Sequence, residues 1–292
     1  MAFETTTDEV VAGLDLTGQT VVVTGASAGL GVETVRVLRG AGARVIGAAR
    51  DLDKARAVVG DIELVELDLA DTASARKAAA DVLALTGRID VLINNAGVMA
   101  CPLGRTAQGF ETQLGTNHLG HFVWTNALLP ALGEGSRIVN LSSRGHLLSG
   151  MRWDDPQWET SPYEKWIAYG QSKTANVLFT VGLDKRLASK GIHAFAVHPG
   201  VITTELGRHL TEEDVAQLGA RRNMARKTVE QGAATQVWAA TSPALDGLGG
   251  IYLEDCEIGE PMAADGSKGY AAHAVDPEQA ERLWVWSEAQ TA

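Results

Sequence analysis

The 292-residue sequence is poor in cysteine, in aromatic residues and in long apolar runs. Its two cysteines, Cys101 and Cys256, cannot build a disulfide framework and suit a reducing compartment. No apolar run reaches the roughly 18 residues that a membrane span needs. The acidic N-terminus also lacks the apolar core of a secretory signal. We therefore expect a cytoplasmic protein without a membrane span.

Positive charge is scarce as well. The chain has 25 Lys and Arg against 36 Asp and Glu, a formal net charge of −11. Because no basic stripe offsets repulsion by phosphates, nucleic acid is excluded as a partner. The cysteines do not form a Cys-x-x-Cys motif or a cluster of ligands, so no metal site is expected.

Apolar residues make up 45% of the chain, enough for one substantial core. β-branched apolar runs, which are typical of buried strands, alternate with segments of helical pattern. We predict strands at 20–24, 44–49, 62–67, 89–93, 137–141, 193–197 and 250–253. Helices are predicted at 6–13, 32–39, 72–86 and 110–130, around Tyr169 to about Ser189, and at the C-terminus with Trp284 and Trp286. This alternation predicts a single α/β domain, with a doubly wound parallel sheet covered by helices on both faces.

A glycine-rich segment, Thr24-Gly-Ala-Ser-Ala-Gly-Leu-Gly31, joins the strand at 20–24 to the following helix. Its glycines permit a tight turn and let the backbone approach a pyrophosphate, while the helix N-terminus offers N–H groups and a positive dipole end. The spacing differs from the Gly-x-Gly-x-x-Gly of many dehydrogenases. The position between a strand and a helix favours a dinucleotide site over a simple turn.

Tyr169 and Lys173 lie four positions apart, and so on one face of a helix. A free phenol, with a pKa of about 10, is too weak an acid for proton transfer at neutral pH. A neighbouring ammonium favours the phenolate and lowers this pKa. We therefore predict that Lys173 tunes Tyr169 as a general acid/base.

Taken together, the ordered motifs resemble the short-chain dehydrogenase/reductase family. They are the glycine loop at 24–31, Leu67-Asp68-Leu69, Asn94-Asn-Ala-Gly97, Asn117, Asn140-Leu-Ser-Ser143, Tyr169 with Lys173, and Pro199-Gly-Val-Ile-Thr-Thr204. The contexts of Ser143, His198 and Cys256 look like the retinol-dehydrogenase-like and WW-domain-oxidoreductase-like branch. The resemblance implies a Rossmann-type single domain over 1–292, with a cofactor-binding and catalytic core at 17–204. An insertion at 144–168 and a substrate lid at 205–230 would complete it.

The resemblance also implies residue roles. Asp68 would bond the adenine amino group, Asn94, Ala96 and Gly97 would shape the wall beside the adenosine ribose, and Ile202 and Thr204 would meet the nicotinamide amide and the pyrophosphate. The implied cofactor-binding residues are Gly25, Ser27, Ala28, Gly29, Leu30, Gly31, Arg50, Asp68, Leu69, Asn95, Ala96, Gly97, Tyr169, Lys173, Pro199, Gly200, Ile202 and Thr204.

The implied catalytic residues are Asn117, Ser143, Tyr169 and Lys173. Ser143 would bond the substrate carbonyl oxygen and stabilise its developing charge, with Ser142 as the competing serine. Lys173 would also bond the nicotinamide ribose, and Asn117 would hold a water that links Lys173 to solvent.

The end of the second strand, Ala49-Arg50-Asp51, bears on the choice of cofactor. An acidic residue near this point accepts hydrogen bonds from the 2′-OH of NAD, whereas an Arg pairs with the 2′-phosphate of NADP. Since the family's discriminating acid falls at Ala49 and Arg50 follows, we expect NADP(H) rather than NAD. The alternative is an exposed Arg50 paired with Asp51.

Two variable regions should surround the substrate. The tryptophans of the insertion, Trp153, Trp158 and Trp166, either line an apolar pocket or anchor the insertion. In the lid, Arg221-Arg222 and Arg226-Lys227 are predicted to form a solvated helix face. Because relatives take lipophilic alcohols and carbonyls such as retinoids and steroids, the resemblance implies a lipophilic small-molecule alcohol or carbonyl as substrate.

The leading hypothesis is therefore an NADP(H)-dependent oxidoreductase. The alternatives are an NADP-binding sensor or scaffold without turnover, an NAD-dependent alcohol dehydrogenase and a nucleotide-sugar epimerase. A serine hydrolase is disfavoured because the chain lacks the Gly-x-Ser-x-Gly nucleophile elbow. Many relatives associate through the helix that carries the tyrosine, which implies a homodimer or homotetramer.

Overall fold

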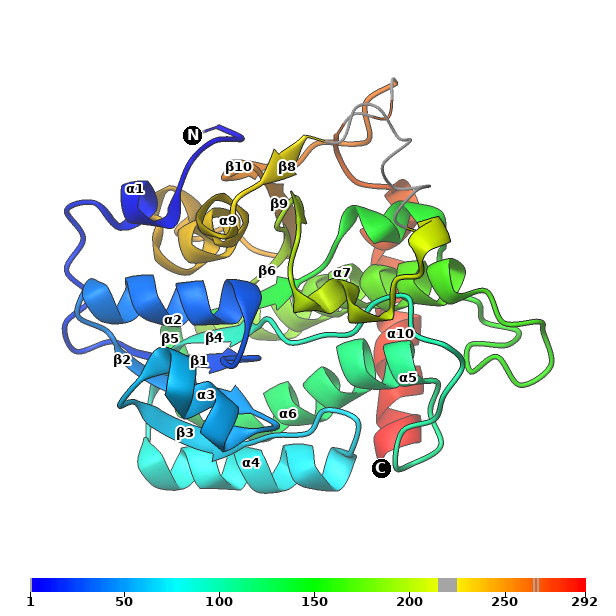
Figure 1. Ribbon diagram of the computed structural model, residues 1–292, viewed down its shortest axis with the longest axis horizontal. Coiled ribbons are helices and arrows are strands. Elements are labelled where there is room, and N and C mark those ends of the chain that lie inside the picture. Colours follow the sequence, from blue (N-terminus) through cyan, green and yellow to red (C-terminus); the bar gives the residue numbers. More distant parts are fainter. Residues whose placement is uncertain (1, 215–224, 265, 267) are drawn as a thin grey trace.

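The computed structural model describes residues 2–214, 225–264, 266 and 268–292. At its centre is an eight-stranded sheet with the order β10-β9-β6-β5-β4-β1-β2-β3, parallel except for β10 (Figure 1). The strands are β1 (Thr20–Thr24), β2 (Arg44–Ala49), β3 (Glu63–Glu66), β4 (Ile89–Asn94), β5 (Leu132–Leu141), β6 (His193–His198), β9 (Ile251–Glu254) and β10 (Glu257–Ile258). Two short strands, β7 (Val201–Ile202) and β8 (Arg226–Lys227), pair separately. The predicted single-domain doubly wound α/β fold is confirmed.

Alternate residues of the central strands enter two different cores. Val22 and Ile46 join one core, whereas Val21, Val23 and Val45 join the other, as the period of two in a strand requires. The first core is closed by α4 (Thr72–Leu85), α6 (His121–Leu128), α7 (Lys165–Leu187) and α10 (Pro277–Thr291). The second is closed by α1 (Thr7–Val11), α2 (Gly29–Gly40) and α9 (Val229–Thr241). Both faces of the sheet are thus covered (Figure 1).

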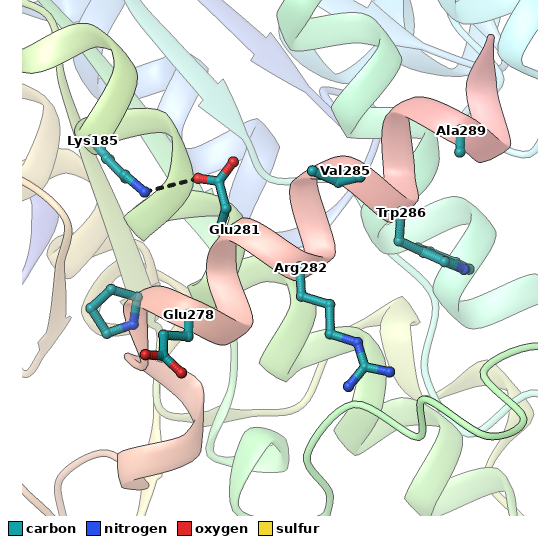
Figure 2. Close-up of a pocket in the computed structure, with 8 residues that line it drawn as sticks. Lys185, Glu278, Glu281, Arg282, Val285, Trp286 and Ala289 are labelled. Carbon is teal, nitrogen blue, oxygen red and sulfur yellow. Dashed lines mark hydrogen bonds and ion pairs between the residues drawn. The ribbon is translucent and has the colours of Figure 1, made fainter.

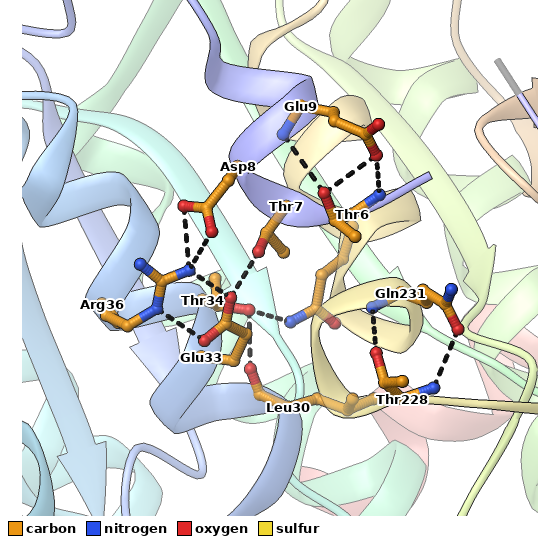
Figure 3. A network of polar contacts seen from close by, with 11 residues as sticks. Thr6, Thr7, Asp8, Glu9, Leu30, Glu33, Thr34, Arg36, Thr228 and Gln231 are labelled. Atoms are coloured by element: carbon orange, nitrogen blue, oxygen red, sulfur yellow. Dashed lines mark hydrogen bonds and ion pairs between the residues drawn. The ribbon is translucent and has the colours of Figure 1, made fainter. Parts of the chain in front are cut away.

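The N-terminal helix α1 is fastened to α2 by polar contacts (Figure 3). It begins with a capping box, in which the side chains of Thr6 and Glu9 each accept a backbone hydrogen bond. Thr7 donates to the buried carboxylate of Glu33, which also accepts from Arg36 at 2.7 Å. Because Glu33 lies on α2, this network ties the N-terminus to the helix that follows the glycine loop.

The predicted helix at 110–130 is wrong as a single helix. The segment forms α5 (Thr112–Leu114), a π-helical turn (Gly115–Gly120) and then α6. A Cβ on Gly120 would lie 2.2 Å from the carbonyl oxygen of Leu69. This turn therefore packs directly against the backbone of Leu69, and a residue larger than glycine would not fit at position 120. π-Helical turns of this kind occur frequently at functional sites. Hydrophobic periodicity cannot reveal such a one-residue expansion.

Smaller differences concern loops. Helix α3 (Leu52–Val59), which begins at the N-cap Asp51, was not predicted, and β5 begins at Leu132 rather than at 137. The prediction of a solvated helix face is wrong for Arg226-Lys227, because β8 pairs with β7 and buries Lys227, whose Nζ lies 2.6 Å from Asp255. Arg221, Arg222 and the expected lid residues 215–224 lie outside the described residues. No helix in the described part of the chain could span a membrane.

The predicted C-terminal helix is present as α10, which packs across α6 and α7. Trp284 contacts Phe122 and Phe179 at centroid distances of 5.0 and 5.9 Å. Arg186 of α7 stacks on the same indole at 4.0 Å, and Glu281 binds Lys185 (Figure 2). The opposite side of α10 carries Arg282, Val285 and Trp286, which line a groove on the outside of the molecule (Figure 2).

Candidate active site

The carboxyl ends of β1 and β4 lie side by side where the strand order reverses, the place at which open α/β sheets form their binding crevice. Thr24 ends β1, and its Oγ1 accepts hydrogen bonds from the N–H groups of Asn95 and Ala96, both at 3.0 Å. Asn95 Nδ2 donates in return to the Thr24 carbonyl at 2.8 Å. The glycine loop and the turn after β4 are therefore held together as one unit.

The glycine loop turns tightly and packs closely on itself. A Cβ on Gly31 would lie 2.2 Å from the carbonyl oxygen of Gly25, and Gly25 itself has φ +76°. Helix α2 begins at Gly29 behind an N-cap, Ala28, that has no side-chain group to bond the first N–H groups. Free amides at the start of a 12-residue helix fit an anionic pyrophosphate. Ser27 and Leu30 are partly exposed in the same loop.

Beyond β2, Arg50 is exposed and forms no hydrogen bond or ion pair with any residue that the structure describes. Asp51 is instead the N-cap of α3, accepting from the N–H of Lys54 at 2.9 Å. The alternative in which Arg50 pairs with Asp51 is therefore not what the structure shows. Asp68 accepts from the N–H of Ala70 through Oδ1, and Leu69 is buried beneath this turn.

Asn94 does not shape the crevice. Its side chain is 1% exposed and donates to Thr125 Oγ1 and Asn140 Oδ1, each at 2.8 Å, inside the core. The predicted contribution of Asn94 to the cofactor wall is wrong, because this residue still belongs to β4 and points into the layer of α6. Asn95, Ala96 and Gly97, which follow the strand, are partly exposed at the crevice.

Tyr169 and Ser143 meet at the end of β5. Ser143 caps the 3₁₀ turn η3 (Arg144–Leu148), and its Oγ accepts from Gly145 N at 3.0 Å. The Tyr169 hydroxyl, on a side chain that is 4% exposed, hydrogen-bonds with Ser143. Ser142 Oγ instead donates to the Lys173 carbonyl at 2.9 Å, away from the phenol. The structure thus brings Ser143, and not Ser142, to Tyr169.

The predicted lowering of the Tyr169 pKa by Lys173 is wrong for this geometry. Burial raises the pKa of Tyr169 to about 12, and the hydrogen bond with Ser143 only partly opposes this. Burial lowers the pKa of Lys173 to about 8. The ammonium lies 5.8 Å from the phenol ring centre and donates to the Leu141 carbonyl at 3.0 Å. Burial disfavours the charged form of both residues and is the main cause of both pKa shifts.

Asn117 reaches the site from the π-helical turn. Its Oδ1 accepts from Val98 N at 2.8 Å, and its Nδ2 donates to Val98 O and to Ser172 Oγ, both at 2.9 Å. A Cβ on Gly97 would lie 3.1 Å from Asn117 Oδ1 and 3.7 Å from Lys173 Nζ, so both side chains flank this glycine. The water contact implied for Asn117 stays a prediction.

The segment after β6 returns over the glycine loop. It turns at Pro199-Gly200, where Gly200 has φ +93°. Ile202 packs on Gly232, at which a Cβ would lie 2.5 Å from Ile202 Cγ1. A Cβ on Gly29 would lie 3.3 Å from Thr204, so this threonine faces the start of α2.

Two of the three tryptophans in the insertion anchor it. Trp158 is buried against Arg152 and Tyr163, and Trp153 Nε1 donates to Gln279 of α10 at 2.6 Å. Trp166 lies edge-on to Tyr169 with ring centres 6.4 Å apart, and donates to Asp214. Anchoring therefore describes Trp153 and Trp158, whereas Trp166 borders the phenol.

Sequence reasoning missed Gly145. A Cβ there would lie 2.7 Å from Tyr169 Cε1, so the phenol rests on a glycine that no recognised motif marked. His146, the histidine next in sequence, contacts the carbonyl of Ser143 at 2.6 Å and not its hydroxyl.

Comparison with known proteins agrees with this geometry. The family model "short chain dehydrogenase" matches residues 19–215. A "Probable oxidoreductase" of Streptomyces lividans is 44% identical over 94% of this chain and 97% of that protein. "Retinol dehydrogenase 11" of Mus musculus is 42% identical over 84% of this chain and 80% of its own. The RhlG/NADP active-site complex of Pseudomonas aeruginosa has a TM-score of 0.67 at 26% identity, covering 82% of this chain and 95% of that one. The chain belongs to the short-chain dehydrogenase family, in its retinol-dehydrogenase-like branch.

Proposed function

We propose that this protein is an NADP(H)-dependent oxidoreductase acting on an alcohol or carbonyl substrate, with Tyr169 as the general acid/base. The observation that carries the proposal is the contact between the buried Tyr169 hydroxyl and Ser143, beside Lys173 and at the crevice of the glycine loop. Nicotinamide, when bound, supplies or accepts the hydride.

The residues of the chain bind, orient and move the proton. The free N–H groups at the start of α2 would bind the pyrophosphate, and Ser143 would donate a hydrogen bond to the substrate oxygen as charge develops there. With a pKa of about 12, Tyr169 carries its proton at neutral pH, and it is still a stronger acid than the alcohol that forms, so it would donate this proton to the developing alkoxide. In the reverse direction, Tyr169 would have to lose its proton before it could take that of the alcohol.

The preference for NADP(H) rests on Arg50. Its guanidinium is exposed at the end of β2 while the carboxylate of Asp51 is occupied by Lys54 N, so the arginine can pair with a 2′-phosphate. We expect R50A to weaken NADPH binding roughly tenfold or more and to leave NADH binding unchanged. The control is R56A, which removes an exposed arginine of α3 that lies 3.7 Å from Asp53. Equal loss for both dinucleotides would argue against this role.

The substrate is proposed to be lipophilic. The indole of Trp166 lies 6.4 Å from the Tyr169 ring between centroids, and the similar mouse protein is named a retinol dehydrogenase. A panel of alcohols, aldehydes and ketones of increasing chain length, followed by nicotinamide absorbance, would rank the candidates.

Tyr169→Phe tests the chemistry. Removing the general acid should lower kcat by about 10²–10⁴-fold while the dinucleotide still binds, as measured by its fluorescence. The matched control is Tyr163→Phe. Tyr163 lies in the insertion, and its hydroxyl donates a hydrogen bond to Glu111 at 2.9 Å. If Y169F turns over at the wild-type rate, the proposed mechanism is wrong. If the wild type binds NADPH but turns over no member of the panel, the sensor alternative is favoured.

A further inference from the structure

His121, at the start of α6, lies between the two halves of the site. It is 1% exposed, and both of its ring nitrogens have partners. Nδ1 lies 3.0 Å from the Asn117 carbonyl oxygen, and Nε2 lies 3.0 Å from Thr24 Oγ1. Thr24 belongs to the dinucleotide crevice, whereas Asn117 flanks Lys173 across Gly97. The imidazole therefore spans from one half of the site to the other.

The partners determine where the imidazole proton resides. A carbonyl oxygen can only accept, so Nδ1 carries the hydrogen and donates it to Asn117. Thr24 Oγ1 already accepts from the N–H groups of Asn95 and Ala96, which use both of its lone pairs. Its hydroxyl hydrogen must therefore point at Nε2, which accepts it. Only the neutral Nδ1–H tautomer satisfies every group, in agreement with burial lowering the pKa of His121 to about 4.

The π-helical turn makes this bridge possible. The backbone N–H of His121 donates to the carbonyl of His118, and the imidazole bonds the carbonyl of Asn117. That carbonyl also accepts from Asn176 Nδ2 at 3.0 Å, while the Asn117 side chain holds Val98. A shift of the imidazole would displace the backbone at both ends of the bridge.

We propose that His121 is a positioning residue that sets the turn after β4 against the Asn117 turn, and so aligns the bound dinucleotide with Lys173 and Tyr169. The role concerns dinucleotide binding and therefore rests on the proposed function. The motifs that the sequence analysis identified do not include His121.

Two substitutions break opposite ends of the bridge. H121N keeps an amide donor near Nδ1 but loses the acceptor for Thr24, whereas H121Q places an amide near Nε2 and loses the donor to Asn117. Each should raise the Kd for NADPH roughly tenfold, in line with the loss of one buried hydrogen bond. Each should also lower kcat while the KM for the carbonyl substrate changes little.

The matched control is H118N. His118 is equally buried in the same π-helical turn, but its Nε2 bonds Ser287 of α10 at 2.7 Å, away from the crevice. H118N should lower Tm and leave the Kd for NADPH within twofold of the wild type. If H121N and H121Q also bind NADPH like the wild type, or if H118N weakens binding as much as they do, the positioning role is refuted.

A second measurement needs no ligand. In ¹⁵N-histidine-labelled protein, His121, identified by its missing signal in H121N, should show the neutral Nδ1–H tautomer from pH 6 to 9. An Nε2–H tautomer, or titration within this range, would overturn the proposal. Failure of the wild type to bind either dinucleotide would instead refute the proposed function, while the tautomer would still decide whether the bridge exists.

Discussion

At the scale of single residues, the site distinguishes two adjacent serines by the direction of their side chains. Ser142 is 3% exposed and bonds the backbone of α7, whereas Ser143 is partly exposed and meets Tyr169. Extended backbone sends successive side chains to opposite faces, so one of the two had to face the helix and the other the crevice. The motif Asn-Leu-Ser-Ser contains both serines. Their positions along the extended backbone at the end of β5 decide which side chain faces the crevice.

This difference predicts opposite outcomes for S143A and S142A. S143A removes a hydrogen-bond donor to the substrate oxygen and should lower kcat by about 10²–10³-fold, with little change in unfolding. S142A leaves the Lys173 carbonyl without its side-chain partner and should cost about 1 kcal/mol of stability. Steady-state kinetics and urea denaturation of both variants measure the two effects. The opposite assignment would require S142A to lose most of the turnover.

At the scale of elements, the critical contact is that of η3 with α7. Gly145 lies under the Tyr169 ring, and a Cβ on Gly170 would lie 2.8 Å from the Gly145 carbonyl oxygen. Two glycines on facing elements thus allow the turn to approach the helix closely. The phenol is held between this turn and the indole of Trp166.

We expect G145A to displace the Tyr169 ring, because the added methyl would lie 2.7 Å from Cε1. The displaced phenol should lower kcat by roughly 10- to 100-fold while NADPH still binds. G87A is the control, since a Cβ at Gly87 meets nothing within 4 Å. A G145A enzyme with wild-type kcat would show that the ring position tolerates the methyl group.

The elements that were predicted correctly are determined by the sequence of the segment itself. The limits of β1 and β2 follow from β-branched and apolar runs bounded by polar residues and glycine, and the glycine loop follows from its place between strand and helix. The π-helical turn, by contrast, depends on Gly120 packing against the Leu69 carbonyl, about 50 residues earlier in the chain. Burial of Lys227 likewise depends on Asp255. Such contacts are decided by distant partners, which a local pattern does not contain.

At the scale of the whole molecule, α10 affects which surface is available for association with a second copy of the chain. The resemblance implies association through the helix that carries Tyr169, yet α10 of the same chain lies along α7, with Arg186 engaged by Glu281 and Trp284. The outer face of α10, with Val285 57% exposed, occupies the surface instead (Figure 2). A homodimer or homotetramer stays a prediction, and one that used this side of the molecule would have to meet α10 first.

The buried histidines of the whole fold predict its behaviour in acid. Burial lowers the pKa of His118 and His198 to about 3, and of His121 and His146 to about 4, against about 6.5 in an unfolded chain. Between pH 6.5 and 4 the unfolded state therefore binds more protons than the folded state, so stability must fall as the pH falls through this window.

Up to four protons should thus be taken up on unfolding near pH 5, a slope approaching about 5 kcal/mol per pH unit. Burial raises the pKa of Glu111 and Glu254, so these carboxyls bind protons earlier in the folded state and offset part of the slope. Free energies of unfolding from urea titrations at half-unit steps between pH 7 and 4.5 measure the net uptake, for which we expect two to four protons. H118N should reduce it by about one, because one buried imidazole is gone. A net uptake of less than one proton on unfolding would mean that these histidines are hydrated or already charged in the native protein.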